Sequence, residues 1–238
     1  MLTRLDKLIA ASGRFSRSEA REAIRAGRVT ADGAVLTRPE EKVDEGALIA
    51  VDGDALRTDA LRCFMLDKPA GILTAARDAR QPTVLDLVPE EYRRLGLQPV
   101  GRLDKDTTGL LLLTNDGALA HRVISPKSGV VKTYLATTDG DTDGSDAAAF
   151  AAGLTLADGT RCLSAALEPL GGGQCLVRVQ EGKYHQVKRM LAARGRRVLE
   201  LRRLAIGALE LDPALGPGKM RELSSNEIEL IFALSHSL

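Results

Sequence analysis

Aromatic residues are scarce in this chain of 238 residues: they make up 3% of it, and tryptophan is absent. Aliphatic side chains must therefore supply most of any core, and hydrophobic residues, at 44%, are plentiful enough to do so. No apolar stretch approaches the roughly 20 residues of a transmembrane helix. The N-terminus is charged from Arg4 onward, so we expect no leader, no contact with a membrane and a cytoplasmic location.

Cysteine is also rare, and its arrangement excludes the usual metal sites. Cys63, Cys162 and Cys175 show neither a CxxC pair nor a Cys/His ligand spacing, and each lies in or beside an apolar run. We interpret them as buried thiols in a reducing compartment. The phosphate-binding pattern GxxxxGK[ST] is absent too, so we expect neither a metal nor a cofactor.

The formal net charge of +1 favours no particular partner, but its distribution is uneven. Cations concentrate in residues 4–28 and again in 183–203, whereas residues 37–59 are mainly acidic. Two separate basic blocks on a nearly neutral chain favour a long polyanion such as RNA. The alternative is that these blocks only keep the surface soluble.

The first block carries the signals of a small helical unit. Ser16 with Glu19 forms a capping box at a helix start, and Gly27 supplies the stop. Apolar residues form one side of this helix and arginines the other. Asp32-Gly33 then predicts the turn of a hairpin over residues 29–36.

Three motifs in this region, RLDK at 4–7, SRSEA at 16–20 and GRVTADG at 27–33, resemble the S4 RNA-binding domain. The resemblance implies a helical pair backed by short strands over residues 1–54. The polar stretch that follows lacks apolar periodicity, so we expect a linker at 55–61 and a second domain at 62–238. The resemblance also implies that structured RNA is held by the arginine face, which consists of Arg17, Arg21, Arg25 and Arg28.

The most chemically dense stretch is GRLDKDTTG at residues 101–109, which precedes an unbroken apolar run, Leu110–Leu113. This pattern predicts a polar loop at the mouth of a buried strand. Functional residues favour such loops, because the strand beneath holds the loop in place while its side chains face a cleft. A surface turn with screened charges is the alternative.

The second domain resembles the bacterial ribosomal pseudouridine synthases. The resemblance is carried by FMLDKPAG, GRLDKDTTGLLLLTNDG, VKTYLA, EGKYHQVKRM and LAIGALEL, in that order. It implies an α+β fold, with a mainly antiparallel mixed sheet, flanking helices and a central cleft. It also implies conversion of uridine to pseudouridine without a cofactor. Within the family, the sequence YHQVKRM at residues 184–190 favours 16S ribosomal RNA as the substrate, either free or within an assembling small subunit. We expect the enzyme to be a monomer.

By this resemblance Asp104 is the catalytic carboxylate, and it can attack the sugar, add to the base or abstract a sugar proton. Each route requires the ionised form, so a nearby cation is expected, and Lys188 matches the family's basic partner better than Arg189 does. Tyr134 matches a family tyrosine that can stack on the target base. We expect Asp106 to orient the loop instead.

Further contacts follow from the same resemblance. Arg102 is a candidate for binding phosphate or for filling the gap left by an extruded nucleotide. Lys183 and Arg189 are candidate RNA contacts. Leu204 and Ile206 are expected to form the pocket wall.

Two rival hypotheses stay open. One is a non-catalytic RNA-binding factor that uses only the S4-like unit, and the other is the same enzyme acting on 23S or transfer RNA. His185, a lone histidine beside two cations, is given no acid–base role.

Overall fold

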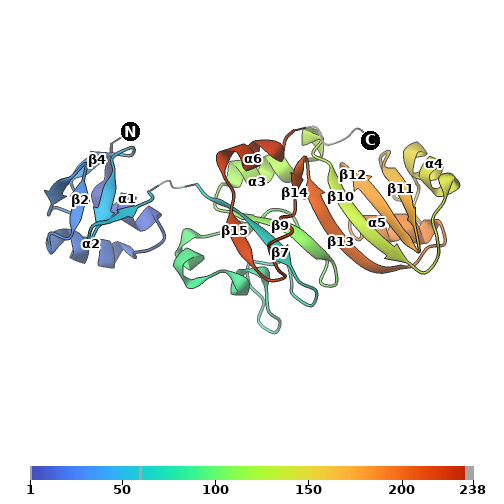
Figure 1. Cartoon of the computed structure of the whole chain (residues 1–238), viewed down its shortest axis with the longest axis horizontal. Coiled ribbons are helices and arrows are strands. Elements are labelled where there is room, and N and C mark those ends of the chain that lie inside the picture. The colour runs from blue at the N-terminus through green and yellow to red at the C-terminus, as the bar shows by residue number, and fades with distance from the viewer. Residues whose placement is uncertain (1, 59–60, 234–238) are drawn as a thin grey trace. The chain divides into compact units, whose positions relative to one another are not determined.

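A computed structural model describes residues 2–58 and 61–233 (Figure 1). The chain divides into two compact units, one formed by residues 1–62 with 88–97 and the other by 63–87 with 98–238. No helix within the described ranges is long and apolar enough to cross a membrane.

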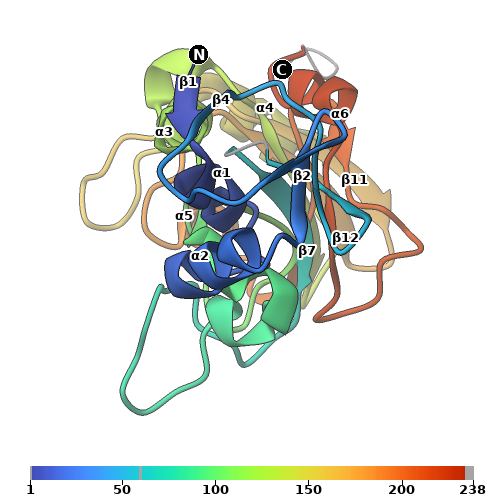
Figure 2. The same ribbon diagram turned by 90° about the vertical axis from the view of Figure 1, so that its left-hand side faces the viewer.

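The first unit packs two helices on a small sheet. Helices α1 and α2 lie side by side (Figure 2) and bury an aliphatic core against the strands. Its elements are β1 Leu2–Arg4, α1 Leu5–Ala11, α2 Arg17–Arg25, β2 Val29–Ala31, β3 Ala34–Leu36, β4 Lys42–Asp44, β5 Ile49–Val51 and β6 Asp54–Leu56. Four strands pair in the order β3-β2-β5-β6, and β1 pairs with β4.

Local signals in the sequence correctly predict this unit. Ser16 accepts a hydrogen bond from the Glu19 amide while the Glu19 side chain accepts one from the Ser16 amide, so the predicted capping box is confirmed. Asp32 and Gly33 both adopt positive φ, at 48° and 83°, as the twist of a tight hairpin requires. Ala20, Ala23 and Ile24 are buried, as the apolar stripe predicts.

The predicted linker at 55–61 begins too early. Residues 54–56 form β6, which pairs with β5 through Ile49 and Leu56, and the side chain of Leu56 joins the core. Hairpin pairing across the Asp52-Gly53 turn therefore extends the unit beyond the predicted boundary. Residues 59 and 60 of the expected linker lie outside the described residues.

A later segment, residues 88–97, also belongs to the first unit. It contains the 3-10 helix η2 Glu90–Leu95, in which Arg94 pairs with Glu19 and Leu95 lies against Gly13. These are side-chain contacts between segments about 75 residues apart in sequence. Periodicity along the chain does not encode contacts of this kind.

The second unit is built on a nine-stranded sheet whose main path runs β11-β12-β10-β13-β9-β7-β15. Its strands are β7 Cys63–Lys68, β8 Gln98–Pro99, β9 Thr108–Thr114, β10 Lys132–Thr138, β11 Ala166–Gly171, β12 Gln174–Val179, β13 Val198–Ile206, β14 Leu209–Glu210 and β15 Met220–Glu222. The described pairs are antiparallel, with β13 and β9 the parallel exception. The mainly antiparallel mixed sheet is thus confirmed.

Helices pack against this sheet, and the second unit has two clusters of buried hydrophobic residues. The α-helices are α3 Gly117–Ile124, α4 Gly144–Ala152, α5 Gln186–Ala193 and α6 Ser225–Leu230, and the 3-10 helices are η1 Val84–Leu87 and η3 Pro126–Ser128. Leu110 to Leu113 on β9 are all fully buried, because this inner strand is covered on both faces. The three cysteines are free and buried, as expected.

Candidate active site

The polar loop of residues 101–107 joins β8 to β9, so the buried strand holds it as the sequence predicts. Gly101 and Gly109 have φ values of 72° and 99°. A Cβ on Gly109 would lie 2.2 Å from the carbonyl oxygen of Arg203, so only glycine lets β9 approach β13 here. Asp104 in this loop lines a cavity of about 80 Å³.

Helix α5 brings a cation to this aspartate from 84 positions along the chain. Nζ of Lys188 lies 3.4 Å from Oδ2 of Asp104, and the two side chains are 21% and 28% exposed. Nε2 of His185 lies 3.4 Å from Oδ1 of Asp104. Lys188 therefore lies near Asp104 as expected, and His185, which was given no role on sequence grounds, contacts the same carboxylate.

Asp106 makes a contact with Lys188 that was not expected. Its Oδ1 accepts a hydrogen bond of 2.6 Å from Nζ of Lys188, and this bond lowers the pKa of Asp106. The carboxylate is 76% exposed, so water screens the pair. Lys188 thus lies between two carboxylates, one partly buried and one at the surface.

Tyr134 projects from β10 into the same cavity, which Arg102 and Thr107 also line. Behind Tyr134, Nη1 of the buried Arg203 lies 3.4 Å from its hydroxyl, and the Arg203 guanidinium carbon is 5.9 Å from the ring centroid. The buried Thr107 hydroxyl has no hydrogen-bond partner within the described part of the chain. The cavity therefore combines a carboxylate, cations, an aromatic ring and an unsatisfied hydroxyl.

Lys68 holds the polar loop in place through hydrogen bonds to backbone carbonyls, and sequence reasoning did not identify this residue. The side chain is fully buried at the end of β7, and Nζ donates to the carbonyls of Pro69, Lys105 and Thr107 at 3.0, 3.3 and 3.0 Å. Burial lowers the pKa of Lys68 to about 8. A lysine at the end of an otherwise apolar strand was the available signal, because such a charge requires partners.

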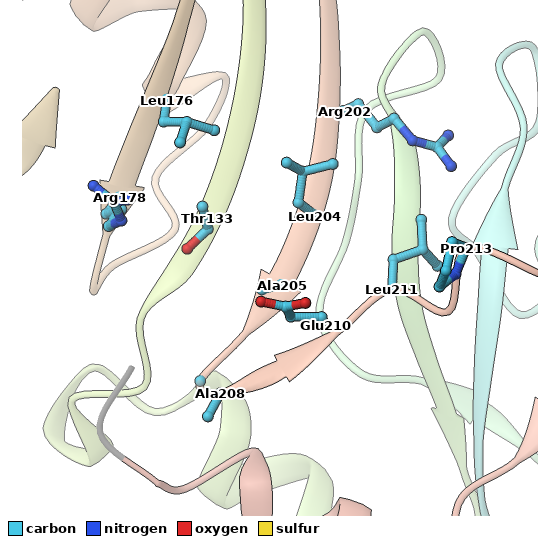
Figure 3. Close-up of a pocket in the computed structure, with 11 residues that line it drawn as sticks. Thr133, Leu176, Arg178, Arg202, Leu204, Ala205, Ala208, Glu210, Leu211 and Pro213 are labelled. Carbon is cyan, nitrogen blue, oxygen red and sulfur yellow. The ribbon is translucent and has the colours of Figure 1, made fainter. Parts of the chain in front are cut away.

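The prediction that Leu204 and Ile206 form the pocket wall is wrong, because neither residue lines the Asp104 cavity. Leu204 lines a separate hollow of about 640 Å³, between Thr133 and Leu211 (Figure 3), and the buried Ile206 packs in a core cluster. Leu201 lines the Asp104 cavity instead. Leu204 is the extra residue of a β-bulge, because Arg203 pairs with Tyr134 and Ala205 with Thr133, and this bulge interrupts the alternation of side chains along β13.

The candidate RNA-binding cations carry ion pairs of their own. Arg17 and Arg21, with Arg4, surround the fully buried carboxylate of Asp6. Although burial alone would raise its pKa, hydrogen bonds from Arg4 and Arg21 bring the pKa of Asp6 down to about 2. These arginines are 40–53% exposed, so each can still reach a ligand.

The other candidate contacts are placed as follows. Arg25 is exposed, and Arg28 pairs with Asp52. In the second unit Lys183 pairs with Glu181, and Nη2 of Arg189 lies 2.5 Å from Oδ2 of Asp158.

Within residues 2–58 and 61–233, no three histidine, cysteine or carboxylate side chains cluster as a metal site would require.

Comparison with known proteins assigns these units. Residues 62–193 match the family model of RNA pseudouridylate synthase, and residues 3–49 match the S4 domain. The first match covers more than half of the chain, so the protein belongs to the RNA pseudouridylate synthase family and is an isomerase that acts on RNA.

Individual RNA pseudouridine synthases are similar to this chain over almost its whole length. The chain is 42% identical over 229 residues to the ribosomal small subunit pseudouridine synthase A of Salmonella typhimurium, covering 94% of this chain and 98% of the relative. It is also 42% identical over 233 residues to the RNA pseudouridine synthase YtzG of Bacillus subtilis, covering 96% and 98%. A crystal structure of a pseudouridylate synthase matches with a TM-score of 0.68 at 37% identity, covering 96% of this chain and 99% of the other.

Proposed function

We propose that this enzyme isomerises a uridine of 16S ribosomal RNA with Asp104 as its catalytic carboxylate. The observation that carries the proposal is the partly buried Asp104 with Lys188 at 3.4 Å, in a cavity that Tyr134 also lines. The substrate assignment rests on similarity over 94% of the chain to a relative named for the ribosomal small subunit. The proposal further takes the enzyme to be a cytoplasmic monomer that meets its RNA either free or in an assembling particle.

The reaction breaks the bond between N1 of uracil and C1′ of the ribose and forms a bond from C5 to C1′. C5 loses its proton and N1 gains one, so no redox partner or transferred group is needed. An ionised Asp104 serves any of its three possible roles: attack on the sugar, addition to the base or abstraction of a sugar proton. Lys188 supplies an opposite charge 3.4 Å from the carboxylate.

The remaining cavity residues act on the extruded nucleotide. A base inside a helix is out of reach of Asp104, so the target uridine must leave the stack. Tyr134 then stacks on the uracil ring, and Arg102, exposed at the mouth of the cavity, contacts phosphate or fills the vacated space. The S4 domain holds the RNA through its arginine face.

The Asp104→Asn variant tests this proposal, because asparagine has nearly the same shape as aspartate but carries no charge. We expect it to bind RNA as the wild type does and to form no pseudouridine. The purified proteins are incubated with 16S, 23S and transfer RNA transcripts, and product positions are mapped by sequencing. Pseudouridine formed by Asp104→Asn would contradict the catalytic assignment, whereas wild-type product in 23S or transfer RNA alone would contradict the substrate assignment.

A further inference from the structure

An exposed aromatic pair lies beside the cavity. The rings of Tyr184 and His185 stack with their centroids 3.8 Å apart and their planes 18° from parallel. Tyr184 is 69% exposed, although aromatic residues make up only 3% of the chain. One of the few large rings available to a hydrophobic core therefore faces solvent instead. The His185 end of the pair reaches within 3.4 Å of Asp104.

The turn that carries this pair is held rigidly. Gln186 donates to Oε1 of the buried Glu181 at 2.8 Å, and its own Oε1 accepts from the Lys183 amide at 2.9 Å. His185 occupies the left-handed region at φ 49°, which is unfavourable for a residue with a side chain and is sustained here by these surrounding bonds. An exposed ring on so fixed a turn loses little entropy when a ligand stacks on it.

A basic groove of about 430 Å³ begins at the same histidine. His185 and Lys188 line it together with Arg189, Arg196 and Arg197. Lys188, Arg189 and Arg196 are already paired with carboxylates, so we expect phosphate contacts in the groove to orient a strand more than to hold it tightly. Stacking on an aromatic ring is the stronger term available here.

We propose that the Tyr184–His185 pair is a stacking platform for the nucleobase next to the target uridine in the substrate strand. The proposal rests on the proposed function, because it needs the uridine at Asp104. With that uridine in the cavity, the backbone leaves past His185, so one neighbouring base meets the Tyr184 ring while its phosphate faces the groove. The platform is tolerant of base identity, since every base has a flat face.

Tyr184→Ala tests the platform against Tyr184→Phe, which keeps the ring, and Leu170→Ala, which trims another exposed apolar side chain on β11. KM and kcat for pseudouridine formation are measured on an RNA segment that contains the mapped target. We expect Tyr184→Ala to raise KM roughly 5- to 150-fold with kcat nearly unchanged. Tyr184→Phe and Leu170→Ala are expected to match the wild type.

Substrates with an abasic nucleotide on the 5′ or the 3′ side of the target complete the test. On one of them the wild type is expected to lose the same factor, and Tyr184→Ala is expected to lose nothing more. An unchanged KM for Tyr184→Ala refutes the platform, as does an equal loss for both proteins on both abasic substrates. A fall in kcat alone would show instead that the ring only steadies His185. If the wild type modifies only 23S or transfer RNA, the 16S assignment fails, and the platform is tested on that RNA.

Discussion

Replacing Lys188 by methionine removes its charge at nearly constant length and tests which carboxylate it serves. At 3.4 Å from Asp104, with both side chains largely buried, an effective dielectric constant near 20 gives an attraction of about 5 kcal/mol before desolvation. At 2.6 Å from the exposed Asp106, a value near that of water gives only about 2 kcal/mol. The longer contact is therefore the stronger one.

We expect Lys188→Met to lower kcat by about 10²- to 10³-fold, as loss of one preorganised charge typically does. Asp106→Asn, which removes only the screened partner, is expected to cost less than about tenfold. Pseudouridine formation is followed under saturating RNA, and thermal unfolding confirms that each variant is folded.

Lys127→Met, at an exposed position in η3, is the matched control and should be fully active. The reasoning is refuted if Asp106→Asn is as inactive as Lys188→Met. Such a result would mean that the surface pair, and not the buried one, organises the site.

Two further predictions concern stability. Gly109→Ala forces a Cβ to 2.2 Å from the Arg203 carbonyl at φ 99°, so it should cost at least about 3 kcal/mol in urea unfolding, whereas Gly117→Ala, with open space around it, should be neutral; equal midpoints would contradict the packing argument. Because the pKa of Asp6 is about 2 when folded and about 3.9 when unfolded, the unfolded state binds more protons between these values. The stability that Asp6 contributes is thus complete above about pH 5 and is lost progressively toward pH 1, by about 2.5 kcal/mol in all, and unfolding curves of Asp6→Asn should lack this loss.

Patterns local in the chain predicted much of the fold. The capping box at Ser16, the Asp32-Gly33 hairpin and the buried run Leu110–Leu113 are confirmed because each depends on neighbours within a few positions. The resemblance to known families added the α+β class and the enzyme class. Leu204 failed as a pocket residue because its face of the strand depends on the register of β13 with β10, which includes a bulge.

The sequence by itself determined the two domain types, the polar loop and the candidate residues Asp104, Tyr134 and Lys188. Tertiary structure alone decided that Lys68 anchors that loop from β7 and that His185 reaches the aspartate. It also decided that Asp106 shares the lysine. The physical reason is that hydrogen bonds and charge pairs fall off within a few ångströms, and only folding brings side chains from distant parts of the chain within that range.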